Sequence, residues 1–218
     1  MDQDGHMRAM DRRRFAQLAG GLALAGCAKD GDAAAGAAHR ADLYQCEGCE
    51  GALERPAATL ASAMRIAAPE EPGEAFLMEG TVFAADKVTS APGVVVYAYH
   101  TNAAGLYANG ASATTWSRRH GRLRGWVKTD AAGRYAFRSI KPAPYPNATM
   151  PAHVHLTVLE PGRRPYWIDD IVFDGEFGVS AAYRSAREDR GGNGIVRLSR
   201  ANGVWRAERH IILERHPA

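Results

Sequence analysis

The sequence predicts a mainly β protein, an antiparallel β-sandwich with few short helices. From Glu74 onward the chain consists of strand-length runs rich in Val, Ile, Tyr, Trp and Phe. Turn signals made of Gly, Pro, Asn and Asp separate these runs at short intervals, which is the spacing typical of a sandwich or barrel. The expected strands are residues 75–84, 93–101, 123–130, 133–141, 152–160, 166–174, 193–200 and 203–213.

Helical signal is weak in this chain. Residues 55–67 are compatible with one helix or with a loop, and residues 180–189 with a short helix. The chain has 218 residues, of which 46% are hydrophobic, so there is material for one domain with a substantial core. We expect a folded β-sandwich domain at 74–218, preceded by a segment at 46–73 that contains two cysteines.

The N-terminal residues 1–27 have the features of a signal peptide. An arginine cluster at 12–15 precedes an apolar run at 18–25, which is shorter than the ~18 residues that a membrane-spanning helix needs. The cluster resembles a twin-arginine signal, and residues 24–27 resemble a bacterial lipobox. These patterns predict an exported protein, periplasmic or at the cell surface, attached to the membrane through a lipidated Cys27. An arginine-rich leader cut by an ordinary signal peptidase is the alternative.

Residues 28–45 begin with an Ala/Gly-rich stretch and predict a flexible tether. Cys46 and Cys49 follow in C-x-x-C spacing, and in an oxidising compartment this spacing favours a local disulfide. A zinc site needs two further ligands nearby, which the sequence does not supply, and a redox role is a third interpretation. The formal net charge is +3 with scattered arginines, so we expect a small-molecule partner and no nucleic acid.

The strongest candidates for metal ligands are His153 and His155. Side chains alternate along a strand, so both imidazoles point to one face of the expected strand 152–160, whereas Val154 and Leu156 point to the other. Their β-carbons then lie about 6.5 to 7 Å apart, a span that one metal ion bridges. A lone H-x-H pair is more often surface or satisfied core, so a metal site requires further ligands.

Two tyrosines in expected loops complete a plausible set. Tyr145 lies between Pro144 and Pro146, which restrict its backbone, and Tyr107 lies in a loop of small residues. A phenol has a pKa of about 10, so it binds a metal at neutral pH only when a strongly Lewis-acidic ion such as ferric iron stabilises the phenolate. Two phenolates and two neutral imidazoles leave a trivalent ion with one positive charge, which a bound hydroxide neutralises.

Four motifs occur in a fixed order: GLY at 105–107, TDAAG at 129–133, GRYAFRSIKPAPYP at 133–146 and PAHVH at 151–155. Together they resemble the intradiol ring-cleavage dioxygenases, the family of the catechol and protocatechuate enzymes. The resemblance covers about residues 75–215 and is most specific across 129–155. The cysteine segment and the export signal indicate a secreted branch of that family.

The resemblance implies a β-sandwich that carries non-haem Fe(III) and cleaves a small aromatic diol with O2 to a muconate-type diacid. It implies that Tyr107, Tyr145, His153 and His155 bind the iron together with a solvent hydroxide. By position, Tyr145 is the axial tyrosine, which leaves the iron and helps to accept a proton from the substrate.

Two positions depart from the family pattern. Met150 stands where the family carries an arginine, and Asp170 stands where the protocatechuate type carries a glutamine. These differences change the local charge by up to two units, which matters at the low dielectric of a buried site. We expect Asp170 to be catalytic, as the acceptor of a proton from the second catechol hydroxyl. We expect Arg138, with Arg163 or Arg164 as alternatives, to supply the compensating positive charge.

Three other interpretations compete. The spacing of His153, His155 and Glu160 matches the first cupin motif, although the flanking glycines and the second motif are missing. A facial triad of the two histidines with Asp169 or Asp170 and ferrous iron is a further option. The non-enzymatic alternative is an envelope-tethered, transthyretin-like binding module without a metal. We interpret four tryptophans as sheet packing, namely Trp116, Trp126, Trp167 and Trp205, although Trp167 is close enough in sequence to the site strand to line a pocket. We interpret four histidines as surface residues, namely His100, His120, His210 and His216.

Overall fold

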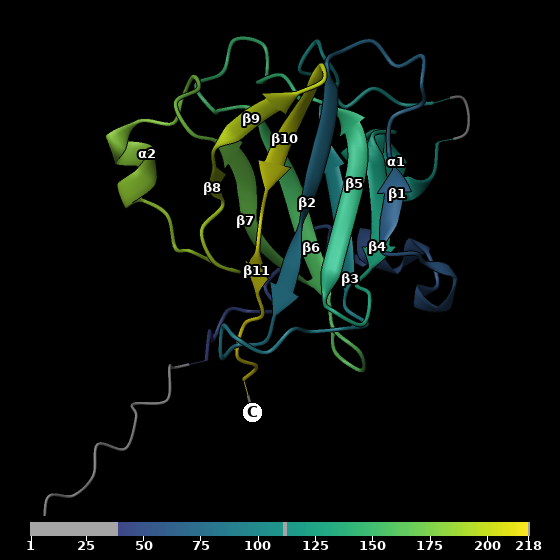
Figure 1. Cartoon of the computed structure of the whole chain (residues 1–218), viewed down its shortest axis with the longest axis vertical. Coiled ribbons are helices and arrows are strands. Elements are labelled where there is room, and N and C mark those ends of the chain that lie inside the picture. Colours follow the sequence, from purple (N-terminus) through teal and green to yellow (C-terminus); the bar gives the residue numbers. More distant parts are fainter. Residues whose placement is uncertain (1–38, 111–112, 218) are drawn as a thin grey trace, which may run out of the picture. The chain divides into compact units, whose positions relative to one another are not determined.

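The computed structural model describes residues 39–110 and 113–217, which form two stacked β-sheets (Figure 1). The strands are β1 (Ala63–Arg65), β2 (Ala75–Phe83), β3 (Val95–His100), β4 (Arg124–Lys128), β5 (Arg134–Ile140), β6 (His153–Leu159), β7 (Tyr166–Phe173), β8 (Ile195–Val196), β9 (Leu198–Ala201), β10 (Val204–Glu208) and β11 (Ile211–Ile212). The helices are the 3₁₀ helices η1 (Cys49–Glu54) and η2 (Ala57–Thr59) and the short α-helices α1 (Thr115–His120) and α2 (Ala181–Ser185).

The two sheets confirm the predicted β-sandwich. The larger sheet has the strand order β1-β5-β2-β10-β9, with β11 also paired to β2, and the second sheet has the order β4-β3-β6-β7-β8. Both sheets are mixed, whereas the sequence predicted antiparallel ones. The pairs β1–β5, β2–β10, β2–β11 and β7–β8 are parallel, and the other pairs are antiparallel.

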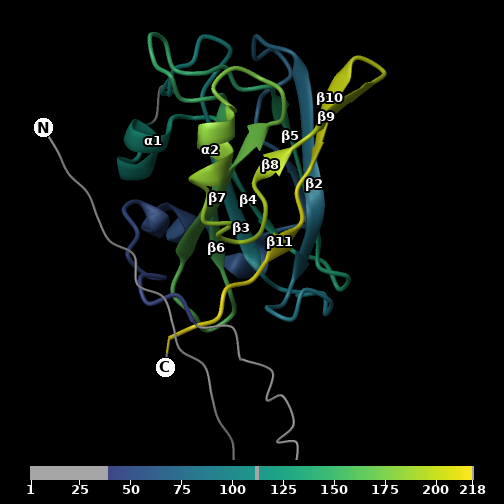
Figure 2. The same cartoon turned by 90° about the vertical axis from the view of Figure 1, so that its left-hand side faces the viewer.

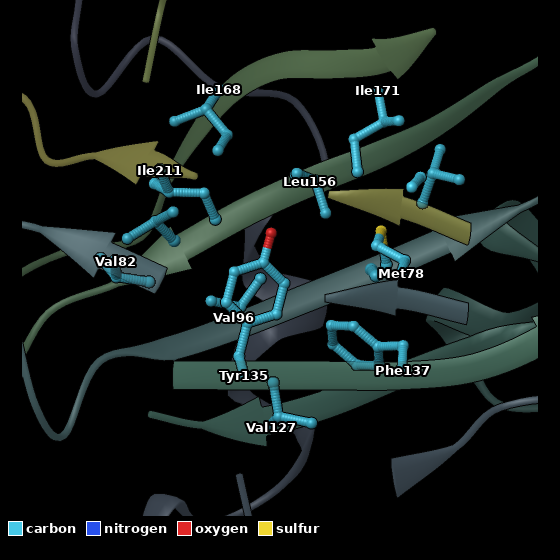
Figure 3. Packing of buried hydrophobic residues seen from close by; sticks show 14 of the residues in the cluster. Met78, Val82, Val96, Val127, Tyr135, Phe137, Leu156, Ile168, Ile171 and Ile211 are labelled. Atoms are coloured by element: carbon cyan, nitrogen blue, oxygen red, sulfur yellow. The ribbon is translucent and has the colours of Figure 1, made fainter. Parts of the chain in front are cut away.

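The main core lies between the sheets. Met78 on β2 and Phe137 on β5 face Leu156 on β6 and Ile171 on β7, and all four side chains are almost fully buried (Figure 3). Burying each such side chain stabilises the fold by about 1.5–3 kcal/mol relative to leaving it exposed. Because Leu156 points into this core, its neighbour His155 points to the opposite, outer face of the second sheet.

Six of the expected strands form single strands, β2 to β7. The expected strands 193–200 and 203–213 each divide into two. The first divides because the chain leaves the second sheet after β8 and joins the larger sheet as β9. Residues 55–67 contain η2 and β1 rather than one helix, because β1 pairs with β5. The short helix expected within 180–189 is confirmed as α2.

The N-terminal segment and α1 cover the outer face of the second sheet, on the side opposite β2 (Figure 2). The indole N–H of Trp126 donates to the carbonyl of Gly51 in η1, at 3.0 Å. Leu43 is fully buried in the main core, so residues 42–45 belong to the fold and not to a tether. The Cys46–Cys49 disulfide is present as predicted.

The expected signal peptide, the lipobox with Cys27 and the tether up to residue 38 lie outside the described residues. Within the part of the chain that the structure describes, no helix has the length and apolar composition needed to cross a bilayer.

Candidate metal centre

The candidate site lies on the outer face of the second sheet, at the beginning of β6. His153 and His155 both point to this face because they are two positions apart on the strand. His153 is 3% exposed, and the His155 side chain is 27% exposed. The strand therefore delivers two imidazoles to one place, as predicted.

A β-bulge in β7 brings a carboxylate to the same face. The register between β6 and β7 shifts between positions 154 and 156, so that Asp169 and Asp170 both lie opposite His155. The extra residue reverses the alternation of β7, and bulges next to functional sites commonly redirect a side chain in this way. As a result Asp170 faces His155, whereas Ile171 returns to the core.

Two loops supply the tyrosines and are fastened to each other. The hydroxyl of Thr101 donates to the carbonyl of Ala143 at 2.6 Å, which joins the loop of Tyr107 to the loop of Tyr145. Gly105 has a φ of +75°, and a Cβ at this position would overlap the carbonyl oxygen of the residue before Tyr145. A glycine is therefore required for the two loops to pack this closely.

The four predicted ligands converge. The phenol oxygens of Tyr107 and Tyr145 are 2.8 Å apart, and the Tyr145 oxygen is 3.1 Å from Nε2 of His153. The Nε2 atoms of His153 and His155 are also 3.1 Å apart. Two oxygen and two nitrogen donor atoms thus lie in a continuous chain of short contacts, which is the arrangement needed to share one ion.

The outer contacts of the two histidines fix their tautomers. Nδ1 of His153 is 2.8 Å from the carbonyl oxygen of Pro151, and Nδ1 of His155 is 2.9 Å from Oδ1 of Asp170. Carbonyl and carboxylate oxygens only accept, so each Nδ1 carries the proton and each neutral ring has a lone pair at Nε2. Two lone pairs therefore face each other at 3.1 Å, and a cation between them satisfies both. The donor set fits a bound metal.

The electrostatics of the tyrosines agree with this interpretation. Burial, together with the contact between the two phenols, raises the pKa of Tyr107 well above its ordinary value. Burial also raises the pKa of Tyr145. Burial and the adjacent His155 lower the pKa of His153, which keeps it neutral. Both phenols are thus protonated until a strongly Lewis-acidic cation displaces their protons.

Asp170 contacts the outer nitrogen of His155 and not the converging donor atoms. Burial, the largest single influence, opposes its ionisation, but His155, His153 and Arg187 together outweigh burial, so the pKa of Asp170 lies below its usual value. One His, His and Asp group, made of His153, His155 and Asp170, is close enough for a metal among the described residues. The bond to Nδ1 of His155 nevertheless places Asp170 behind the ligand, and Asp169 pairs with Arg187 at 2.7 Å. This geometry argues against the facial triad.

Two histidines interpreted as surface residues are buried: His120 packs beside the site, whereas His100 points to the inner face of the second sheet, where its Nε2 is 2.8 Å from the hydroxyl of Ser139. His100 and His120 are 1% and 2% exposed. The ring of Tyr99 stacks on the ring of His155 with centroids 4.5 Å apart and on that of His120 with centroids 4.0 Å apart. Tyr99 therefore restricts the orientation of the His155 ring. Sequence reasoning missed this because a neutral, stacked histidine has the same sequence signal as an exposed one.

A cavity of about 330 Å³ lies next to the candidate metal centre. Its lining includes His155, Asp170, Trp167 and Arg187, together with both cysteines of the Cys46–Cys49 disulfide. Trp167 therefore lines a cavity, which was the alternative to sheet packing that its sequence position allowed. Of the four predicted ligands only His155 lines this cavity, so it borders the candidate centre on the side of the Asp170 carboxylate.

The structure does not bring the predicted compensating arginines to this site. Arg138 lies on β5 in the other sheet and is exposed on its outer face, and Arg163 and Arg164 are exposed in the turn after β6. Arg187 is the cation that borders the cavity. Its position after α2 gave no sequence signal, since only the fold brings that loop beside β7. Met150 is 48% exposed.

These features define a class of protein: a β-sandwich in which two histidines of one strand and two loop tyrosines bring their donor atoms close enough to hold a single metal ion. A family profile described as "Dioxygenase" matches residues 52–190, well over half of the chain. The chain belongs to the intradiol dioxygenase family.

Individual relatives are similar in sequence and in fold. Catechol 1,2-dioxygenase 2 of Acinetobacter lwoffii is 31% identical over 143 residues, which cover 53% of this chain and 50% of that protein. The dioxygenase domain of a dioxygenase–carbohydrate-binding fusion from Streptomyces sp. SirexAA-E has a TM-score of 0.52 at 21% identity, covering 70% of this chain and 89% of that chain. Catechol 1,2-dioxygenase from Pseudomonas arvilla C-1 has a TM-score of 0.52 at 23% identity, covering 70% and 56%. The chain thus spans about half the length of the curated relative.

Proposed function

We propose that this protein is a non-haem ferric dioxygenase that cleaves a catechol-type ring between its two hydroxyl-bearing carbons, adding O2 to give a muconate-type diacid. The observation that carries the proposal is the convergence of Tyr107, Tyr145, His153 and His155 with both Nε2 lone pairs directed inward. Phenolates and imidazoles together suit ferric iron better than they suit Ca²⁺ or Mg²⁺, which prefer carboxylate, carbonyl and water oxygens.

The protein's own residues supply positioning and proton transfer. Iron bound by the four side chains would act as a Lewis acid toward a catechol and bring it into reaction with O2. Tyr145 is suited to take up a substrate proton at its phenol oxygen, because burial raises its pKa and the neutral phenol is favoured once it is free. Pro151 and Asp170 hold the two imidazoles in the required tautomer.

The decisive experiment combines spectroscopy with oxygen uptake. Protein loaded with ferric iron is expected to show strong visible absorption from phenolate-to-iron charge transfer. It is then supplied with a panel of catechols under ¹⁸O2, and the diacid product is expected to contain both labelled oxygen atoms. A colourless preparation, or one that consumes no O2 with any catechol, would contradict the proposal.

A transthyretin-like binding module is not favoured. Such a module has no use for two inward-facing imidazoles joined to two phenols, whereas the family and the donor geometry both account for them. The cupin interpretation is not favoured either, because Glu160 binds Tyr166 and His216 and none of the converging ligands.

We also propose that the protein is exported and anchored through Cys27. The arginine cluster and the lipobox-like run support this, and so does the Cys46–Cys49 disulfide, since such bonds persist in oxidising compartments. Labelling with a radioactive fatty acid tests the anchor, and a Cys27→Ser variant that still incorporates label would contradict it.

A further inference from the structure

The two histidines of the candidate metal centre are not equivalent, because their outer partners differ in charge. His153 donates from Nδ1 to the neutral carbonyl of Pro151 at 2.8 Å. His155 donates from Nδ1 to the carboxylate of Asp170 at 2.9 Å. An outer hydrogen bond to a carboxylate raises the basicity of the ligating nitrogen more than a bond to a carbonyl does.

The carboxylate is built into the site and is not an incidental surface group. The β-bulge in β7 directs Asp170 to the outer face opposite His155, and its side chain is 28% exposed. The neighbouring carboxylate of Asp169 pairs separately with Arg187 at 2.7 Å, and among the described residues Asp170 forms no ion pair with an arginine or lysine. The negative charge of Asp170 is therefore directed at His155.

We propose that Asp170 is a positioning residue that makes His155 the stronger of the two imidazole donors and thereby favours the ferric over the ferrous state of the site. The inference rests on the proposed function, since it concerns the same four ligands. It assigns Asp170 a role through His155, in place of the substrate-proton acceptor expected from the sequence. The two roles differ in a testable way, because a ligand effect is present before any substrate is added.

The charge of Asp170 acts on the iron through one imidazole ring. A negative charge this close stabilises a trivalent ion more than a divalent one, because the Coulomb energy scales with the charge of the ion. Removing the charge makes the iron a better electron acceptor. The reduction potential is then expected to rise, and the phenolate-to-iron charge-transfer band is expected to move to longer wavelength, since less energy is needed to transfer an electron to the iron.

The test uses two substitutions of Asp170 in the iron-loaded full chain without substrate. Asp170→Asn removes the charge but keeps an oxygen that accepts from Nδ1 of His155, and Asp170→Ala removes both. Asp174→Asn is the matched control, because Asp174 is a partly exposed carboxylate after β7 that pairs with Arg184 and not with a histidine. Circular dichroism and thermal unfolding show whether each variant is folded.

Both Asp170 variants are expected to have a higher iron reduction potential and a phenolate-to-iron charge-transfer band at longer wavelength. Asp174→Asn is expected to leave the potential and the band unchanged. A tenfold greater loss of ferric than of ferrous affinity corresponds to about 59 mV for a one-electron couple. Asp170→Ala is also expected to bind iron about 10- to 100-fold more weakly, as is typical for loss of an outer partner.

Folded Asp170 variants with the wild-type potential and band would overturn the inference, even if turnover falls. That outcome differs from failure of the proposed function. If the wild-type protein itself shows no charge-transfer band and no oxygen uptake, then the four-ligand iron site is wrong. If the wild type shows both and Asp170→Asn changes neither potential nor band, only the role of Asp170 is wrong.

Discussion

Two of the tyrosine and histidine clusters among the described residues use similar contacts for different purposes. The first, called here the metal cluster, consists of Tyr107, Tyr145, His153 and His155. The second, called here the C-terminal cluster, consists of Tyr44, Glu160, Tyr166 and His216. In the C-terminal cluster Tyr44 is 2.6 Å from Nδ1 of His216, whose Nε2 is 2.8 Å from Glu160, and Tyr166 donates to the same glutamate at 2.8 Å.

The two clusters differ in how many protons they need. In the C-terminal cluster every short contact pairs one donor with one acceptor: Nε2–H of His216 and the hydroxyl of Tyr166 both donate to Glu160, and Tyr44 donates to Nδ1 of His216. That cluster is complete without any ligand. Its effect is to fasten the last residues of the chain to the N-terminal segment and to β7.

When donors and acceptors are matched in the same way, one short contact of the metal cluster has no hydrogen to form it, so a proton or cation is missing there. Both Nδ1 protons are donated outward, so no hydrogen lies between the Nε2 atoms of His153 and His155. The comparison shows that proximity of tyrosine and histidine does not by itself indicate a metal site. The direction of the outer hydrogen bonds indicates whether a metal binds, because it determines whether lone pairs or protons face one another at the centre of the cluster.

The largest expected effect comes from removing one imidazole from each cluster. His153→Ala is expected to weaken ferric iron binding by more than the about 100-fold that loss of an outer partner causes, because a direct ligand is lost. His216→Ala is expected to bind iron normally but to lose stability, since Glu160 and Tyr44 lose their shared partner. Iron content after dialysis and the urea unfolding midpoint measure the two effects.

The reverse pattern would show that the clusters have been assigned incorrectly. If His216→Ala releases the iron, or if His153→Ala retains it with an unchanged spectrum, the metal does not lie between the two Nε2 atoms. His210→Ala serves as a further control, because His210 is exposed and belongs to neither cluster.

The second effect concerns the phenols. Tyr145→Phe is expected to remove one of the two phenolates and so to reduce and shift the visible charge-transfer absorption of the iron-loaded protein. Tyr44→Phe removes an equivalent hydroxyl from the C-terminal cluster and is expected to leave the spectrum unchanged. Absorption spectra at equal iron content make this comparison. An identical spectrum for Tyr145→Phe would exclude Tyr145 as a ligand.

The sequence predicted the core of the metal cluster because local rules were sufficient there. Strand alternation places His153 and His155 on one face, and the prolines around Tyr145 restrict its loop. No local rule places the two tyrosine loops next to that strand. They were assigned to the same site because the order of the motifs resembles that of the family. The fold class followed in the same way, from strand-length runs and turn residues.

Other features depend on tertiary contacts that leave no local pattern. The bulge that turns Asp170 toward His155 is a shift of register between two strands, which the run WIDDIVF does not reveal. Asp170 was expected at the site only because it stands at the position of the family's glutamine. Arg138 was expected at the site from its sequence position, but the chain order does not reveal that β5 lies in the other sheet. The burial of His120 likewise depends on stacking with Tyr99.

The third effect is a loss of stability in acid, which arises from a histidine buried between the two sheets. His100 on β3 contacts the carbonyl of Thr101 and the hydroxyl of Ser139, and burial lowers its pKa to about 4. The unfolded chain has a histidine pKa of about 6.5 and therefore binds the proton first as the pH falls. Stability is thus complete above about pH 6.5 and is lost between that value and pH 4, by at most about 3 kcal/mol for this residue.

Urea unfolding of the metal-free protein at pH 7 and at pH 5 measures this dependence. His100→Gln is expected to be less stable at pH 7 but to have a flatter pH dependence, because the residue that binds the proton on unfolding is gone. His120, whose pKa burial also lowers to about 4, contributes in the same direction and remains in the variant. A slope as steep as that of the wild type would exclude His100 as a source of the acid sensitivity.

The smallest effect is expected at the Cys46–Cys49 disulfide, which borders the cavity but supplies none of the four predicted ligands. It closes a very short loop, so loop-closure entropy limits its contribution to about 2 kcal/mol or less. Cys46→Ser with Cys49→Ser is expected to lower the unfolding free energy by that amount and to leave the iron spectrum unchanged. If the double variant loses the spectrum, the segment that carries η1 supports the metal cluster directly. The inward lone pairs would then not be sufficient to hold the iron.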